Sequence, residues 1–225
     1  MKIKKKCNRI LILGDIHTPF ADMELIKQAA EFNKKFKADL VLCTGDMLDQ
    51  KAFSKYPKDP EDDGPALEWE KAVAQCLEIE KHFPEMVILG SNHDRRYMKK
   101  ATEAGLPKIM IRTLKELIPI HGWQWHLGPD PLVLNNNIAC MHGDELQGAP
   151  IVKATKLGMN VIQGHTHQAS LQYLQTFKKQ LWAIDPGCMV DKKGAAFDYA
   201  ASSLTKVFTG FGAIDNNVPM IIPKK

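Results

Sequence analysis

Residue types that bind metal ions recur at five points along this 225-residue chain, each just after a short apolar run. In chain order, these residues are Asp15, His17, Asp46, Asn92, His142, His165 and His167. Carboxylate, imidazole and amide oxygen donors without thiolates favour a divalent transition metal such as manganese, iron or zinc over a structural zinc site. A single Gly-Asp or His-Gly pair indicates little, because such pairs are common in turns. Five successive occurrences together predict a metal centre.

The apolar runs have the composition of buried strands, and each ends in a polar or glycine-containing turn. The five runs are residues 9–13, 39–44, 87–89, 138–141 and 160–163. A helix from a cap at Asp22 to about Phe36 separates the first two runs, which predicts parallel strands joined by a right-handed crossover. Because parallel strands bring their carboxyl ends to one edge of a sheet, the candidate ligands should converge there.

The rest of the chain predicts helices and short strands around this centre. Helices are expected at about 65–82, 94–118 (interrupted near 105–107) and 149–158, and a surface loop at 51–65. Hairpin-like stretches are expected at 123–126 and 132–134, and antiparallel strands at 171–177, 180–184, 196–199, 204–208 and 218–222. The prediction is an α/β fold of two packed mixed β-sheets flanked by helices. We expect the whole chain, residues 1–225, to form a single domain with a basic N-terminal tail at about residues 1–8.

The composition fits a water-soluble globular protein, with 44% hydrophobic and 25% charged residues. A formal charge of +4 permits an anionic substrate without requiring nucleic acid. The five cysteines are scattered, no secretory signal precedes them, and no apolar run is long enough to span a bilayer. We therefore expect a cytoplasmic protein with reduced cysteines and no membrane partner. The sequence leaves the oligomeric state open.

His93 adjoins the third apolar run and can move a proton near neutral pH. Arg95 and Arg96 follow it and are candidates for binding a phosphate, although a solvated surface is an equally good interpretation. Phe53 and Tyr56 could stack on a base, but an ordinary surface loop is the favoured interpretation.

With these motifs, the sequence resembles the calcineurin-like metallophosphoesterase superfamily from about residue 10 to residue 190. The pattern of that family is Asp-x-His, Gly-Asp-x-x-Asp, Gly-Asn-His-Asp/Glu, a lone His and Gly-His-x-His. Here, in order, it reads Gly14-Asp15-Ile16-His17, Gly45-Asp46-Met47-Leu48-Asp49, Gly90-Ser91-Asn92-His93-Asp94, His142-Gly143 and Gly164-His165-Thr166-His167. A later turn, Asp185-Pro186-Gly187-Cys188, resembles the Asn-Pro-Gly-Ser turn of many phosphodiesterase-like members. The resemblance implies the four-layer α-β-β-α sandwich of the superfamily.

The resemblance also implies roles for these residues around two divalent ions, with manganese favoured and iron, zinc or nickel as alternatives. Asp46 would bridge the two ions. The other ligands would divide into two sets: Asp15, His17 and His167 for one ion, and Asn92, His142 and His165 for the other. His93 would protonate the leaving oxygen or stabilise its charge, and Asp49 would orient His93. His121 is a rival for the lone histidine, but a clearer apolar strand precedes His142.

The expected reaction is hydrolysis of a phosphate ester by a hydroxide that bridges the two metals. Serine/threonine phosphatases of this superfamily carry two arginines at the positions of Gln50 and Leu89, and this chain has an extra residue, Ser91, within Gly-Asn-His. We therefore predict a phosphodiesterase acting on nucleotide or nucleic-acid diesters. The alternatives are a phosphomonoesterase for nucleotides or phosphoproteins, a small DNA nuclease, and a non-catalytic scaffold with this fold. The filled ligand positions disfavour the scaffold.

Overall fold

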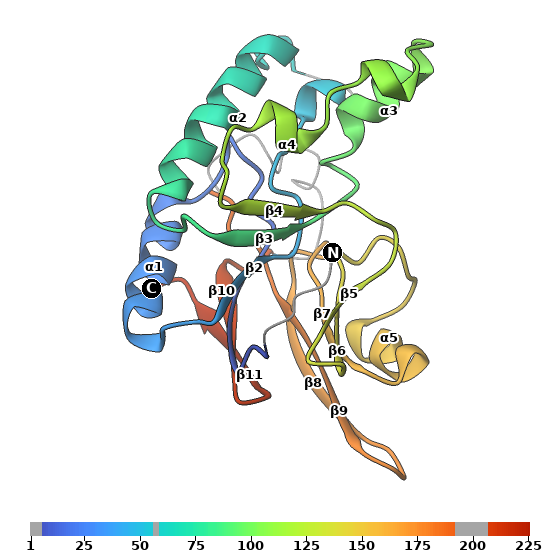
Figure 1. Cartoon of the computed structure of the whole chain (residues 1–225). Coiled ribbons are helices and arrows are strands. Elements are labelled where there is room, and N and C mark those ends of the chain that lie inside the picture. The colour runs from blue at the N-terminus through green and yellow to red at the C-terminus, as the bar shows by residue number, and fades with distance from the viewer. Residues whose placement is uncertain (1–5, 56–58, 192–206) are drawn as a thin grey trace.

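Two β-sheets pack face to face in the computed structural model, which describes residues 6–55, 59–191 and 207–225 (Figure 1). Within these residues, sheet one runs in spatial order β11 (Val218–Pro223), β10 (Gly210–Asp215), β1 (Arg9–Leu13), β2 (Leu40–Cys43), β3 (Met86–Leu89) and β4 (Trp123–His126). Sheet two runs β5 (Leu132–Leu134), β6 (Ile138–Cys140), β7 (Asn160–Ile162), β9 (Gln180–Pro186) and β8 (Ala169–Gln175). Both sheets mix parallel and antiparallel pairs. The predicted fold class is confirmed.

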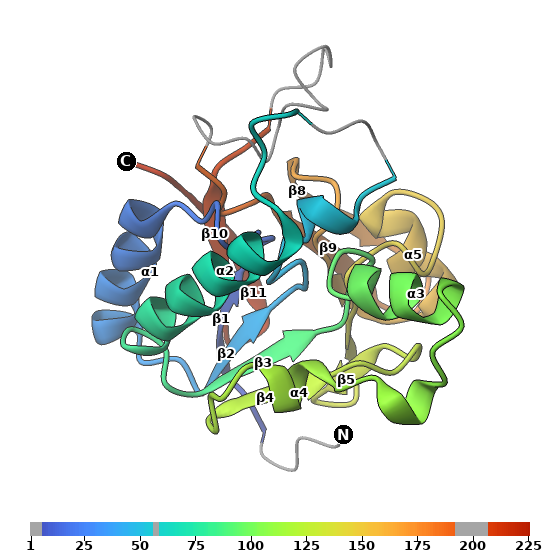
Figure 2. The same ribbon diagram turned by 90° about the horizontal axis from the view of Figure 1, so that it is seen from above.

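Helices cover the outer faces of both sheets (Figures 1 and 2). The helices α1 (Met23–Phe36) and α2 (Pro65–Glu80) pack on sheet one, and α5 (Pro150–Leu157) packs on sheet two. The shorter helices are η1 (Lys51–Phe53), α3 (Arg96–Glu103), η2 (Lys108–Met110) and α4 (Leu114–Leu117). The Asp22 carboxylate accepts the Leu25 N–H at 3.1 Å, which fixes the start of α1 at the predicted cap. None of the helices among the described residues combines the length and apolar character needed to cross a membrane.

Apolar side chains fill the three spaces between these four layers. Alternate residues of β1 divide between two of them: Leu11 and Leu13 pack toward the helices, and Ile10 and Ile12 pack toward sheet two. Because both faces of β1 are covered, its sequence is an unbroken apolar run rather than an alternating one. The third space lies between sheet two and α5, where Ala154 is fully buried.

Neighbouring parallel strands end together, which brings their following turns into contact. The backbone N–H of His17 donates to the Asp46 carbonyl at 2.7 Å, joining the turns after β1 and β2. In sheet two, the Gly164 N–H donates to the His142 carbonyl at 2.9 Å, joining the turns after β6 and β7. The two sheets therefore each present a set of connected turns at their carboxyl ends.

The two stretches expected to be hairpin-like, 123–126 and 132–134, differ in how they pair, and only the second lies in a hairpin. Both stretches form strands, but β4 pairs parallel with β3 in sheet one, whereas β5 pairs antiparallel with β6 in sheet two. The residues between these two strands thus carry the chain from one sheet to the other. Their partners are set by packing across the sandwich, which local sequence does not encode.

The C-terminal part of the chain contains one strand that was not predicted from the sequence. The predicted strand at 196–199 lies outside the described residues, and of 204–208 only Val207 and Phe208 are described, neither of them in a strand. The strand that pairs with β1 is β10, at 210–215. A Cβ at Gly212 would lie 3.3 Å from both Ile12 and Ile184, so this glycine lets the two sheets approach closely.

Candidate functional site

The candidate ligands meet where the carboxyl ends of the two sheets come together. The turns of sheet one supply Asp15, His17, Asp46 and Asn92, and those of sheet two supply His142, His165 and His167. The backbone N–H of His165 donates to Asp15 Oδ2 at 2.7 Å and so links the two sheets directly. The structure therefore brings together all seven residues that the sequence singles out.

A first group of donor atoms comes from Asp15, His17, Asp46 and His167, and these atoms lie within 4.8 Å of one another. His17 Nε2 lies 3.0 Å from His167 Nε2 and 3.3 Å from Asp46 Oδ2. His167 Nε2 lies 3.2 Å from Asp15 Oδ2. Imidazole nitrogens and carboxylate oxygens thus point at one common centre, as they do in metal sites.

A second group forms around His142, Asp46 and His165. His142 Nε2 lies 3.4 Å from Asp46 Oδ1 and 3.2 Å from His165 Nδ1. The Asn92 side-chain oxygen joins them at 2.9 Å from His142 Nε2. Asp46 therefore belongs to both groups, with Oδ2 facing the first and Oδ1 facing the second.

Four of the candidate ligands adopt a left-handed backbone, which is uncommon for residues other than glycine. Their φ angles are 53° at His17, 46° at Asp46, 74° at His165 and 54° at His167. Each such residue costs on the order of 1–3 kcal/mol, and they cluster at functional sites. Here the sharp bends let a single short turn aim His165 at the second group and His167 at the first.

Two glycines make room for the side chains of the site. A Cβ at Gly164 would lie 2.2 Å from Asp15 Oδ1 and 2.5 Å from Thr44 Oγ1. Gly45 has a φ of +108°, and a Cβ there would lie 2.8 Å from His142 Nδ1. The glycines before Asp46 and His165 are thus required by close packing.

Neighbouring groups fix the orientation of two histidine rings. Asp49 Oδ1 accepts a hydrogen bond from His17 Nδ1 at 2.7 Å, and the Thr44 carbonyl accepts one from His142 Nδ1 at 3.0 Å. Both contacts leave Nε2 facing the donor groups, and they set the tautomer in the way common for metal-bound histidine. Thr44 Oγ1 also donates to Asp15 Oδ1 at 3.1 Å. Sequence reasoning missed Thr44, whose only signal is its place before Gly45.

Burial and neighbouring charges have opposite effects on the pKa values of the acidic and histidine side chains in the site. Burial disfavours the ionised form of Asp46, but the nearby His142 and His93 rings outweigh it and hold the pKa of this carboxyl well below its usual range. Burial also disfavours protonation of His17, yet Asp46 and Asp49 raise its pKa to about 10. A cation that binds His17 must therefore displace a proton, so its affinity should rise with pH.

His93 lies beside the first group and makes contacts of its own. Its Nδ1 donates to the Asp49 carbonyl at 2.8 Å and lies 3.3 Å from the Asp49 carboxylate. Arg96 Nη2 lies 2.7 Å from His93 Nε2, and Arg96 Nη1 donates to the Asp49 carbonyl at 2.9 Å. Because a guanidinium only donates, Nε2 accepts and the ring is held in its Nδ1–H form. Asp49 thus contacts two histidines, and its carboxylate lies closer to His17 than to His93.

The remaining candidate residues lie outside both donor groups. Arg95 pairs with Asp144 at 2.8 Å and thereby joins the turn after β3 to the turn after β6. His121 is exposed and belongs to neither group. Phe53 is partly buried against the start of α2, and Tyr56 lies outside the described residues.

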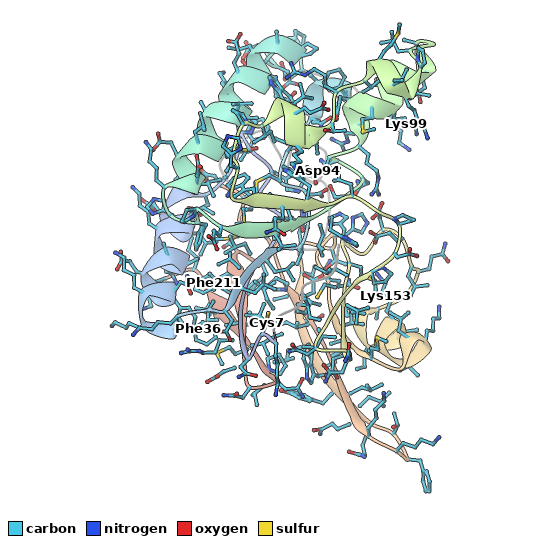
Figure 3. The ribbon with its side chains drawn as sticks, in the orientation of Figure 1. Cys7, Phe36, Asp94, Lys99, Lys153 and Phe211 are labelled. Carbon is cyan, nitrogen blue, oxygen red and sulfur yellow. The ribbon has the colours of Figure 1, made fainter. Side chains whose placement is uncertain are left out.

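Asp94, labelled in Figure 3, connects the turns that carry Asp46 and His93. Its Oδ1 accepts the Leu48 N–H at 3.0 Å, and its Oδ2 accepts the Ser91 hydroxyl at 2.8 Å. Burial, reinforced by the charge of Asp46, raises the pKa of Asp94 to about 6. The extra residue in the Gly-Asn-His motif, Ser91, is thus accommodated by a hydrogen bond within its own turn.

Three solved structures that are similar to this chain have low sequence identity to it. The phosphoesterase Yfce from E. coli is 15% identical, with 96% of this chain and 92% of that chain covered and a TM-score of 0.50. Vacuolar protein sorting 29 from Cryptosporidium parvum is 16% identical, with 93% and 85% covered and a TM-score of 0.48. The nuclease MPE from Pseudomonas putida is 13% identical, with 94% and 87% covered and a TM-score of 0.46.

A comparison with curated protein sequences found no match. The family model for calcineurin-like phosphoesterases, in contrast, matches residues 8–192, a stretch that contains every strand-end residue of both donor groups. The resemblance inferred from the motifs is confirmed. This chain belongs to the calcineurin-like phosphoesterase family.

Proposed function

We propose that the protein is a dinuclear metal-dependent phosphoesterase that hydrolyses phosphodiesters of the nucleotide or nucleic-acid type. The observation that carries the proposal is the position of Asp46, whose two carboxylate oxygens face separate groups of donors. A carboxylate shared in this way can bridge two cations and keep them close together.

The donor set supports a pair of divalent cations. Asp46 would be shared, Asp15, His17 and His167 would complete one site, and Asn92, His142 and His165 would complete the other. Oxygen and imidazole ligands suit manganese, our first choice, and also iron, zinc or nickel. Neither donor group contains a cysteine, which argues against a structural zinc site.

Bound cations of this kind lower the pKa of water and offset charge on phosphoryl oxygens. The side chains of the protein would position the ester against them. His93 Nε2 lies 4.0 Å from Asp46 Oδ2, so it borders the centre. We assign it to the leaving oxygen in the state in which it is released from Arg96 and carries a proton. Arg96 already donates to His93 Nε2, and a phosphate oxygen bound there would compete for the same guanidinium. Arg95 would act farther out, at the rim.

Two buried positions support diesters over phosphoproteins as substrates. Gln50 occupies one position of the phosphatase arginine pair, and its side chain instead donates to the Asp94 carbonyl and accepts the Tyr97 N–H. Leu89 occupies the other and packs between the two sheets. A monoester carries more negative charge than a diester, and these two positions offer it no cationic partner.

Hydrolysis of bis-p-nitrophenyl phosphate beside the p-nitrophenyl monoester tests this proposal. The protein would be stripped of metal and reconstituted with manganese. Asp46→Ala should lose metal and activity together, whereas Glu85→Ala removes an exposed carboxylate at the opposite end of β3 and should change neither.

Three outcomes separate the alternatives. Diester cleavage that survives in Glu85→Ala and disappears in Asp46→Ala would support the phosphodiesterase. Turnover of the monoester alone would indicate a phosphatase instead. Bound metal without turnover of either compound, or of cyclic nucleotides and DNA ends, would favour a scaffold that retains its ligands.

A further inference from the structure

The outer edge of β8 is unprotected, unlike the other sheet edges in the described part of the chain. The edge strand β11 carries Pro219 and Pro223, which lack the N–H needed for pairing, and β4 and β5 span only 4 and 3 residues. By contrast, β8 spans 7 residues, Ala-Ser-Leu-Gln-Tyr-Leu-Gln, with neither a proline nor a charge. Figure 1 shows the β8–β9 hairpin extending beyond the rest of the molecule. Long, uncharged edges of this kind readily pair with another strand.

Alternate residues of β8 direct their backbone groups away from β9. The Trp182 N–H donates to a side chain of β7, and the Ile184 carbonyl accepts from the residue after β7, so both face away from β8. Their β8 neighbours, Tyr173 and Leu171, are therefore in non-hydrogen-bonded pairs. By alternation, the residues with outward N–H and C=O groups are Ala169, Leu171, Tyr173 and Gln175. Within residues 6–55, 59–191 and 207–225, none of these backbone groups has a hydrogen-bond partner.

We infer that β8 is a homodimer interface, in which two copies of the chain pair their β8 strands antiparallel about a two-fold axis at Gln172. In this register Ala169 of each copy faces Gln175 of the other, and Leu171 faces Tyr173. Every outward N–H and C=O group then has a partner, because each facing pair exchanges two hydrogen bonds. A second copy is the natural partner, since one strand supplies both halves of a self-complementary contact and brings no like charges together.

The side chains agree with this register. Tyr173 is 51% exposed in the single chain, and Leu171 packs partly against the apolar layer between the sheets. Facing each other across the axis, these side chains would extend that layer into the second copy. The same register brings the hairpin tip of one copy, with its fully exposed Phe177, alongside the segment of the other copy that carries His167. The dimer would thus cover an aromatic ring that the single chain leaves in solvent.

A cysteine at the axis tests the register directly. The two Gln172 residues would face each other in a non-hydrogen-bonded pair. Their Cα atoms would then lie about 4.5 Å apart, which is within the range that a disulfide can span. Gln172→Cys should therefore form a covalent dimer on mild oxidation of the full chain. Leu174→Cys is the matched control, because its two copies would lie four residues out of register, about 13 Å apart. The five native cysteines are buried and should not interfere.

Light scattering on size-exclusion fractions gives an independent readout of mass. The unmodified chain should have twice the monomer mass at micromolar concentration, and Tyr173→Pro should return it to the monomer mass. That substitution removes an outward N–H and keeps the ladder to β9, so circular dichroism should remain unchanged. A monomeric unmodified chain would overturn the inference. So would cross-linking of Leu174→Cys that equals that of Gln172→Cys.

Discussion

Asp185 gives the sharpest test of the electrostatic reasoning, because it is a fully buried acid beside the candidate metal site. Its Oδ2 accepts the Thr166 hydroxyl at 2.7 Å, and its Oδ1 accepts the Gly187 N–H at 3.1 Å. Burial, reinforced by the charge of Asp15, nevertheless raises the pKa of Asp185 to about 8. The neutral acid is therefore the form that the folded protein favours.

The sign and size of the effect on stability follow from linkage. In the unfolded chain this carboxyl titrates near pH 4, so between about pH 4 and pH 8 only the folded state holds the proton. The free energy of unfolding then falls as pH rises, by about 1.4 kcal/mol per pH unit for this group. Over the whole window the loss is at most about 6 kcal/mol, and it is complete above the folded pKa.

Asp185→Asn should remove this loss, because an amide cannot ionise and keeps the same shape. Near pH 4 the variant and the parent should have similar stability in chelator, and by pH 9 the variant should be more stable by several kcal/mol. Urea unfolding followed by tryptophan fluorescence measures this between pH 4 and pH 9. Added metal should shrink the difference, since a cation offsets the charge of Asp15. Parallel stability curves for the two proteins in chelator would refute the reasoning.

Two further predictions concern the metal centre itself. His93→Ala should keep its metal content, but its rate of diester hydrolysis should fall about 10²- to 10⁴-fold. Asp46→Ala should lose both its metal and its activity. Full activity in His93→Ala would contradict the role given to this ring. Gly164→Ala should lower both metal content and melting temperature, because its Cβ would lie 2.2 Å from Asp15 Oδ1. Gly128→Ala is the control, since a Cβ there meets nothing within 4 Å, and equal metal loss in both alanine variants would exclude the packing explanation.

The site was predictable from sequence because its parts lie at strand ends. Buried parallel strands read as unbroken apolar runs, and the residue types that follow them stand out against that background. The left-handed backbone at His17 and Asp46 was not predictable, because nothing in the local sequence marks a non-glycine residue for that conformation. Nor could the sequence indicate that the Asp49 carboxylate lies closer to His17 than to His93, since that depends on how two turns pack.

The fold shows the same division between local and long-range information. The cap at Asp22 and the stop at Gly158 are local signals, and α1 and α5 begin and end beside them. The strand β10 is hidden because Gly210 and Gly212 weaken its strand propensity, although the close approach of the sheets favours a small residue at Gly212. When two segments that are distant in the sequence pack closely, neither segment carries a local sequence pattern that predicts the contact.

Each group of candidate metal ligands takes residues from both sheets, and this has a consequence for biosynthesis. His17 and His167, 150 residues apart, belong to the same donor group, and the second group likewise draws on both sheets. A nascent chain that has left the ribosome only through β3 therefore holds no complete group, however well its first strands have formed. Metal uptake should follow the docking of sheet two onto sheet one, after the long chain segment between them has closed. Occupancy of the centre would then report that the sandwich has been assembled.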